Sequence, residues 1–90
     1  MAAFYHIYIT PQTGVTRAKV EEQLNLAKDW FRYHERCYVV ETTSDELKWQ
    51  ARLLPLVQPT GHLFICKLDF THYEGFMNQA FWDWIRPKLT

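Results

Sequence analysis

Residues 4–9, with the sequence FYHIYI, constrain this chain more than any other segment, because they are apolar on both faces. Aromatic and β-branched residues predict a strand here that ends before Pro11. Side chains alternate along a strand, so one face carries Phe4, His6 and Tyr8 and the other Tyr5, Ile7 and Ile9. Large exposed apolar patches are rare on monomers. Both faces of the sheet must therefore be covered, the second either by the C-terminal segment or by a second protomer.

The composition is that of a single folded domain spanning residues 1–90. A chain of this length builds one hydrophobic core, and its 48% hydrophobic and 17% aromatic content excludes intrinsic disorder. A formal net charge of zero argues against a protein that coats nucleic acid or membranes non-specifically, and it leaves a local basic patch open. No apolar run is long enough to span a membrane, and no signal peptide is recognisable, so we expect a cytoplasmic protein.

The first half of the chain contains one predicted helix and a predicted hairpin. Thr16 is a suitable cap for a helix whose apolar face carries Val20 and Leu24 and extends, in the same period, to Ala27 and Phe31. Residues 30–33 also suit a strand, paired through a tight turn at residues 35–36 with a strand at 37–42. The sequence leaves open whether residues 30–33 end the helix or begin that strand.

The second half contains two further helices and one strand. Thr43 and Glu46 match a capping box for a helix that ends at Pro55. Its predicted core stripe is Leu47, Ala51 and Leu54, and a second stripe is Trp49, Leu53 and Leu56. A strand is expected at residues 62–68. A terminal helix is expected from residue 77 to Arg86, with the stripe Met77, Ala80, Phe81, Trp84 and Ile85.

If residues 31–34 form a strand, the elements follow the order βαββαβ with one additional helix. This order predicts an α+β fold, specifically a ferredoxin-like sandwich with an appended C-terminal helix. In such a fold two helices cover one face of the sheet only. The C-terminal helix or a partner must then cover the other face, which the first strand makes apolar.

Several segments resemble the small SinR-like proteins, whose fold is similar to the small subunit of the CRISPR spacer-integration complex and to VapD-type ribonucleases. The segments are YHIYI (5–9), DWFRY (29–33), CYVVETTS (37–44), HLFICKL (62–68), YEGFM (73–77) and FWDWI (81–85). The resemblance covers nearly the whole chain and implies a ferredoxin-like fold and a homodimer. It also implies that an Asp at the end of the first strand would hold a divalent metal in the nuclease members.

The position of that acid is occupied here by Thr10, and no carboxylate lies between Met1 and Arg17. A neutral hydroxyl does not supply the charge of a carboxylate ligand to Mg²⁺. We therefore expect no catalytic residues, no metal site and no cofactor. The first hypothesis is a non-catalytic interaction module that forms a homodimer and can bind a further protein partner.

The expected interface is an aromatic surface built from the open sheet face and from two tryptophans that lie off the main helix stripes. Its residues are Phe4 and Tyr8 on the first strand, and Trp49 and Trp82. Tryptophan and tyrosine are enriched at interface hot spots. The alternative interpretation is that each of them shields a local edge of the core.

A basic and aromatic cluster near the hairpin suggests nucleic-acid binding as an alternative function. Its candidate residues are Arg32, Tyr33, Arg36, Lys48 and Arg52. Arginines would hold phosphates while Tyr33 stacks on a base. Acidic residues in the same region, among them Asp29 and Glu35, equally allow a mixed-charge solvated surface.

A nuclease or toxin-like ribonuclease of the same fold is the remaining alternative. Asp69, His72 and Glu74 lie close together after the last strand and form the best local set for acid–base chemistry. A solvated loop explains them equally well. The two cysteines, Cys37 and Cys66, match no metal or disulfide pattern, and we expect them to be core thiols.

Overall fold

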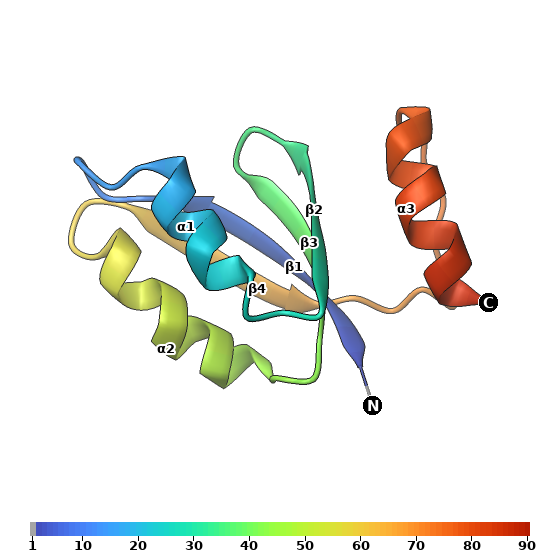
Figure 1. Cartoon of the computed structure of the whole chain (residues 1–90), viewed down its shortest axis with the longest axis horizontal. Coiled ribbons are helices and arrows are strands. Elements are labelled where there is room, and N and C mark those ends of the chain that lie inside the picture. The colour runs from blue at the N-terminus through green and yellow to red at the C-terminus, as the bar shows by residue number, and fades with distance from the viewer. Residues whose placement is uncertain (1) are drawn as a thin grey trace.

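The computed structural model describes residues 2–90, which form an antiparallel sheet and three helices. The elements are β1 (Ala3–Thr10), α1 (Arg17–Leu24), β2 (Asp29–His34), β3 (Cys37–Thr42), α2 (Glu46–Val57), β4 (His62–Lys67) and α3 (Gln79–Leu89). The strand order across the sheet is β2-β3-β1-β4 (Figure 1). The predicted α+β class is confirmed, and residues 30–33 belong to a strand.

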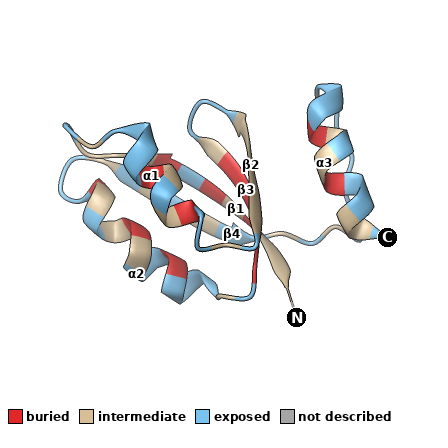
Figure 2. Ribbon diagram, in the orientation of Figure 1, coloured by how far each residue is buried: buried red, intermediate tan, exposed pale blue. Residues whose placement is uncertain are grey.

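Helices α1 and α2 cover one face of the sheet, and α3 lies on the opposite side (Figure 1). The face of β1 that carries Tyr5, Ile7 and Ile9 is buried beneath α1 and α2, as the strand alternation predicts. The remaining buried members of this core are Val20, Leu24, Tyr38, Val40, Trp49, Leu53 and Val57. Figure 2 shows the buried positions on the strands and on the helix surfaces that face them.

A second, smaller core lies between the sheet and α3. Its buried residues are Val39, Phe81 and Ile85. Phe31 on β2 contacts both Phe81 and Trp84, with ring centroids 5.8 Å and 5.6 Å apart. The C-terminal helix therefore covers part of the second face within the same chain, which is one of the two arrangements that the sequence left open.

Polar contacts fix the C-terminal end of α3 to the sheet. Lys88 Nζ donates to Asp29 Oδ2 at 2.8 Å and to Glu41 Oε1 at 3.2 Å, and Trp84 Nε1 donates to Asp29 Oδ2 at 3.0 Å. Partial burial acts to raise the pKa of Asp29, but hydrogen bonds from Lys88, the Trp30 amide and Trp84 hold it below its ordinary value. The carboxylate of Asp29 is thus stabilised by the helix that it anchors.

Helix α1 is shorter than its apolar period allows. It is capped by Thr16 as predicted, and it ends at Leu24. Phe31 therefore lies on β2 and not on the helix. The β-branched and aromatic content of residues 29–34, together with pairing to β3, outweighs the helical period here.

Helix α2 differs from the prediction in its cap and in the face that it buries. Asp45 is the N-cap and accepts from the Lys48 amide at 2.9 Å, so the predicted capping box of Thr43 and Glu46 is wrong. The buried residues are Trp49, Leu53 and Val57, whereas Leu47 is 69% exposed. Burying the large indole with two aliphatic side chains removes more apolar surface from water than the predicted stripe would.

Both prolines near helix ends lie inside their helices. Helix α2 continues past Pro55 to Val57, and α3 continues past Pro87 to Leu89. Each proline lies within the last turn or so, where only one backbone hydrogen bond is lost. Helix α3 begins at Gln79 behind the cap residue Asn78, so Met77 precedes the helix and does not form its first stripe position.

Candidate interaction surface

Helix α3 covers the β2 and β3 side of the outer sheet face and leaves the β1 and β4 side open. Phe4 is covered by Phe70 of the following segment, with ring centroids 5.4 Å apart. Further along β1, Tyr8 is 37% exposed, and its cross-strand neighbour Phe64 is 60% exposed. Cys66, which lies on β4, is also exposed, so the expectation that it is a core thiol is wrong. The uncovered surface is therefore an aromatic pair on the two strands farthest from α3.

Strand β4 also forms one edge of the sheet, and its free backbone groups can be assigned from the register. The Leu68 amide donates to the Phe4 carbonyl at 2.9 Å. In an antiparallel pair the hydrogen-bonded positions alternate, so Cys66 and Phe64 also bond to β1. Leu63, Ile65 and Lys67 consequently direct their N–H and C=O groups away from β1. We call this row, together with Tyr8 and Phe64, the β4 edge surface.

Apolar side chains flank the β4 edge surface on the helical side as well. Leu47, at 69% exposure, and Leu63 line a shallow hollow of about 220 Å³ between α2 and β4. The four residues from Leu63 to Cys66 carry no charge and include no proline. Charged side chains, prolines and bulges are the usual devices that prevent an edge strand from pairing with another chain.

The opposite edge of the sheet, β2, carries these protective features. Its register shifts between Arg32 and His34, and Asp29 and Arg32 place charges on the strand. It is also the strand against which α3 packs. The two edges thus differ in chemistry: β4 carries one charged side chain, Lys67 at its C-terminal end, and its centre, residues 63–66, is apolar.

Of the four predicted interface residues, the structure leaves only Tyr8 on an open aromatic surface. Trp49 is fully buried in the core, where its Nε1 donates to Thr42 Oγ1 at 3.2 Å, so its assignment to an interface is wrong. Trp82 is half-buried between Phe81 and Tyr73, with Arg86 4.6 Å above its ring. The exposed aromatic residue beside Tyr8 is instead Phe64, which was not among the residues predicted from the sequence. Its position opposite Tyr8 in an antiparallel register was the signal that could have identified it.

The predicted nucleic-acid residues fall into three separate places. Arg32 and Arg36 line one pocket together with Arg17, which sequence reasoning did not include. Tyr33 lies on the outer face, where its hydroxyl and His6 Nε2 form a 2.6 Å hydrogen bond. It therefore cannot stack a base beside Arg32, whose cross-strand partner is Tyr38 of the inner core.

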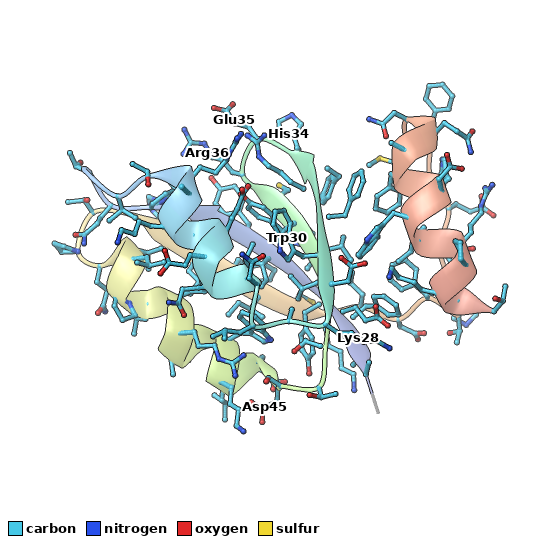
Figure 3. All side chains as sticks on the ribbon, viewed as in Figure 1. Lys28, Trp30, His34, Glu35, Arg36 and Asp45 are labelled. Carbon is cyan, nitrogen blue, oxygen red and sulfur yellow. The ribbon has the colours of Figure 1, made fainter. Side chains whose placement is uncertain are left out.

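The two basic residues of α2 do not extend that cluster. The Lys48 amide bonds to Asp45, and Asp45 and Arg36 lie beyond opposite ends of β3 (Figure 3). The guanidinium of Arg52 sits 4.6 Å over the Trp49 ring. The prediction of one continuous patch from Arg32 to Arg52 is therefore wrong, because α2 begins far from the β2–β3 hairpin.

The loop proposed for acid–base chemistry forms a local turn. Asp69 accepts from both the amide and the hydroxyl of Thr71, at 2.9 Å and 2.6 Å, and these bonds lower its pKa. His72 and Glu74 are exposed. Among residues 2–90, no three His, Cys, Asp or Glu side chains are grouped so that they could hold a metal ion.

Within the described residues, none of the helices has both the length and the apolar character needed to cross a membrane. Comparison with protein-family models, with curated proteins and with solved structures finds no match to this chain.

Proposed function

We propose that this protein is a non-catalytic interaction module that forms a homodimer through the β4 edge surface. In this arrangement β4 pairs in antiparallel orientation with β4 of a second copy. The observation that carries the proposal is the apolar centre of this edge, residues 63–66, with backbone groups at Leu63, Ile65 and Lys67 that point away from β1. The occupant is a second copy, because an antiparallel strand pairs with itself about a two-fold axis.

Side chains on both sides of the edge favour the same partner. A two-fold axis at β4 would bring Phe64 near its symmetry mate on the outer face and Leu47 toward the partner on the helical face. Both are large apolar side chains, at 60% and 69% exposure. Their burial adds a hydrophobic contribution to the backbone hydrogen bonds, and β4 itself contributes no carboxylate that would oppose association.

We further propose that the fold is ferredoxin-like and that the chain is related to the SinR-like proteins. The element order βαββαβ and the strand order β2-β3-β1-β4 support the fold assignment. The residue that occupies the position of the nuclease acid supports a non-catalytic role. It is Thr10, whose hydroxyl donates to the Tyr8 hydroxyl at 3.1 Å.

Sedimentation velocity over a concentration range of about 5 to 200 µM tests the dimer, because that range covers typical weak-to-moderate homodimers. The wild-type protein is expected to sediment as a dimer, and Phe64→Lys as a monomer. The matched control is Leu26→Lys, since Leu26 is equally exposed at 60% and lies beyond the end of α1. A wild-type monomer at the highest concentration, or a dimeric Phe64→Lys, would contradict the proposal.

Amide hydrogen exchange distinguishes strand pairing from packing of the outer faces. In the dimer, the amides of Leu63, Ile65 and Lys67 are expected to become protected, because they bond to the partner. The amides of Phe64 and Cys66 are protected in the monomer and the dimer alike, because they bond to β1. Dimerisation without protection at Ile65 would instead indicate face-to-face packing.

The non-catalytic part of the proposal has its own test. Incubating labelled RNA and duplex DNA with the protein, with Mg²⁺ or Mn²⁺ and with chelator, is expected to yield no metal-dependent cleavage. Cleavage that disappears in His72→Ala would refute the non-catalytic assignment and locate the activity in the loop after β4.

A further inference from the structure

A second surface feature lies at the hairpin end of the sheet. Between the start of α1 and the β2–β3 turn, the molecule has a pocket of about 490 Å³. The buried core side chains Ile9, Val20 and Tyr38 lie beneath it, and Pro11 and Ala18 are its accessible apolar lining. Arg17, Arg32 and Arg36 line the rest. These arginines come from a helix, a strand and a turn, so only the tertiary fold brings them together.

The partners of these arginines leave much of their donor capacity free. Arg17 Nε lies 3.4 Å from Glu21 Oε2, one helical turn away, in a pair whose arginine is exposed and whose carboxylate is half-buried. Arg32 donates from Nε and Nη2 to the Glu35 carbonyl, at 3.2 Å and 3.1 Å, which fixes its guanidinium across the hairpin. A guanidinium has five N–H donors, so three remain on Arg32. Figure 3 shows Arg36 and Glu35 at the tip of this hairpin.

The hydroxyl of Tyr38 locates two of the arginines independently. It donates to Glu21 Oε2 at 3.1 Å. Burial is the main cause that raises the pKa of Tyr38 to about 12, and the hydrogen bond to Glu21 acts in the same direction. The positive charges of Arg32 and Arg17 act to lower this pKa. The geometry agrees, because Arg32 is the cross-strand partner of Tyr38, and Arg17 and the Tyr38 hydroxyl share the Glu21 carboxylate.

The charge of the lining defines the kind of ligand that it would accept. Arg17, Arg32 and Arg36 line the pocket with one carboxylate, Glu35, and a second carboxylate, Glu21, pairs with Arg17. The five side chains together leave an excess of one positive charge. Planar guanidinium groups bind phosphate oxygens in bidentate geometry. Thr16, Arg17 and Ala18 at the start of α1 also line the pocket, and N–H groups in the first turn of a helix lack intrahelical acceptors.

We propose that this pocket binds a phosphate monoester attached to an apolar or planar group, as in a nucleoside monophosphate. The phosphate oxygens would accept from the free guanidinium donors, and Pro11 and Ala18, the accessible apolar lining residues, would contact the attached group. The volume falls within the range of about 300 to 1,000 Å³ that is typical of small-molecule sites. This inference goes beyond the homodimer and does not depend on it, since the pocket shares no residue with the β4 edge surface.

Isothermal titration and two-dimensional NMR with adenosine monophosphate, adenosine and inorganic phosphate test this proposal. Adenosine monophosphate is expected to bind and to shift the amide signals of residues 16–18 and 35–36. Adenosine is expected to bind at least about tenfold more weakly, because it lacks the charge-assisted hydrogen bonds. Equal affinity for the nucleoside and the nucleotide, or no binding of the nucleotide at millimolar concentration, would overturn the proposal.

Two variants and a control separate this site from general charge effects. Arg36→Gln is expected to weaken nucleotide binding by about tenfold, the loss of one charge-assisted contact. Lys19→Gln removes the same charge from the exposed surface of α1 and is expected to change affinity less than about twofold. If Arg36→Gln is poorly folded by circular dichroism, Arg17→Gln, an exposed position, takes its place. Unchanged affinity in the folded arginine variant would overturn the proposal.

A further binding experiment distinguishes a free nucleotide from the 5′ end of a nucleic acid as the source of the phosphate. A 5′-phosphorylated RNA oligonucleotide that binds more tightly than adenosine monophosphate would identify the end of a nucleic acid as the source. Equal or weaker binding would identify the free nucleotide. In either case, the same oligonucleotide with a 5′-hydroxyl group is expected not to shift the amide signals of residues 16–18. A shift of those signals by the 5′-hydroxyl oligonucleotide would contradict recognition of a phosphate monoester.

Discussion

His6 is a titratable side chain between the sheet and the segment that leads to α3. Its Nε2 and the Tyr33 hydroxyl lie 2.6 Å apart, and a neutral ring can accept this bond. Burial lowers the pKa of His6 below 6.5. The unfolded chain therefore takes up a proton before the folded one does as the pH falls. The free energy of unfolding is expected to decrease from pH 7.5 through 6.5 and to stop decreasing, for this group, below the folded pKa.

Urea denaturation at pH 7.5 and at pH 5.5 measures this dependence. His6→Gln removes the titrating group and is expected to reduce the loss of stability between the two pH values. His72→Gln is the control, because that ring is exposed on the loop after β4, and it should retain the wild-type dependence. A His6→Gln protein with the full wild-type slope would show that another group causes it.

Single tryptophans illustrate what a sequence can and cannot predict at the scale of one residue. Trp49 and Trp82 both lie off the expected apolar stripes, and the same argument placed both at an interface. In the structure Trp49 is buried in the larger core and donates a hydrogen bond to Thr42, whereas Trp82 packs against aromatic neighbours at the surface. Periodicity defines two faces of a helix, but which face meets the sheet depends on contacts distant in sequence.

The N-terminus of α2 offers a prediction at the scale of an element. Asp45 accepts from the Lys48 amide at 2.9 Å, and Thr43 lies outside the helix. Asp45→Ala is therefore expected to lower the free energy of unfolding by about 1 kcal/mol, the typical cost of losing an N-cap. Urea denaturation at neutral pH measures this difference.

Two companion substitutions make the cap assignment specific. Thr43→Ala is expected to cost less than about 0.5 kcal/mol, since its side chain is exposed and caps nothing. Asp45→Asn keeps a capping oxygen and is expected to recover most of the loss in Asp45→Ala. If Thr43→Ala proved the more damaging change, the capping box suggested by the sequence would be the correct description.

The strands are the elements that the sequence predicts well. Each of them is short, rich in β-branched or aromatic residues and bounded by a turn or a proline, so its signal is local. The end of α1 was ambiguous because residues 30–33 satisfy a helical period and a strand composition together. Pairing between Phe31 and Val39 decides in favour of the strand, and that contact is not local information.

The candidate sites were less predictable than the fold, for a related reason. Arg32 and Arg36 are near neighbours in sequence, and the hairpin brings them to one pocket. Arg17 joins them only because α1 packs across the sheet beside the hairpin. Likewise, Phe64 becomes a candidate interface residue only when β4 is known to be an edge strand. Tertiary neighbours, more than residue types, determine both surfaces.

At the scale of the whole molecule, residues 2–90 form two hydrophobic cores, one on each face of a single sheet. The larger core joins α1 and α2 to the sheet, and the smaller one joins α3 to it. Helix α3 follows a connection over residues 68–78 that has no helix or strand. A terminal helix with its own small core and an irregular connection can detach as a unit while the rest of the sheet stays folded.

Alanine substitutions in the two cores test this division. Ile85 and Leu53 are both 0% exposed, one in each core, so either change should create a cavity and cost about 2–5 kcal/mol of local stability. In Ile85→Ala, the amides of α3 are expected to exchange faster in native-state hydrogen exchange, while those of Ile7 and Ile9 in β1 keep most of their protection. Leu53→Ala removes support from the larger core and should reduce protection in β1 and α3 together, because α3 has no folded sheet to pack against once that core opens. Equal loss of protection at Ile7 and in α3 for Ile85→Ala would instead show that both cores form one cooperative unit.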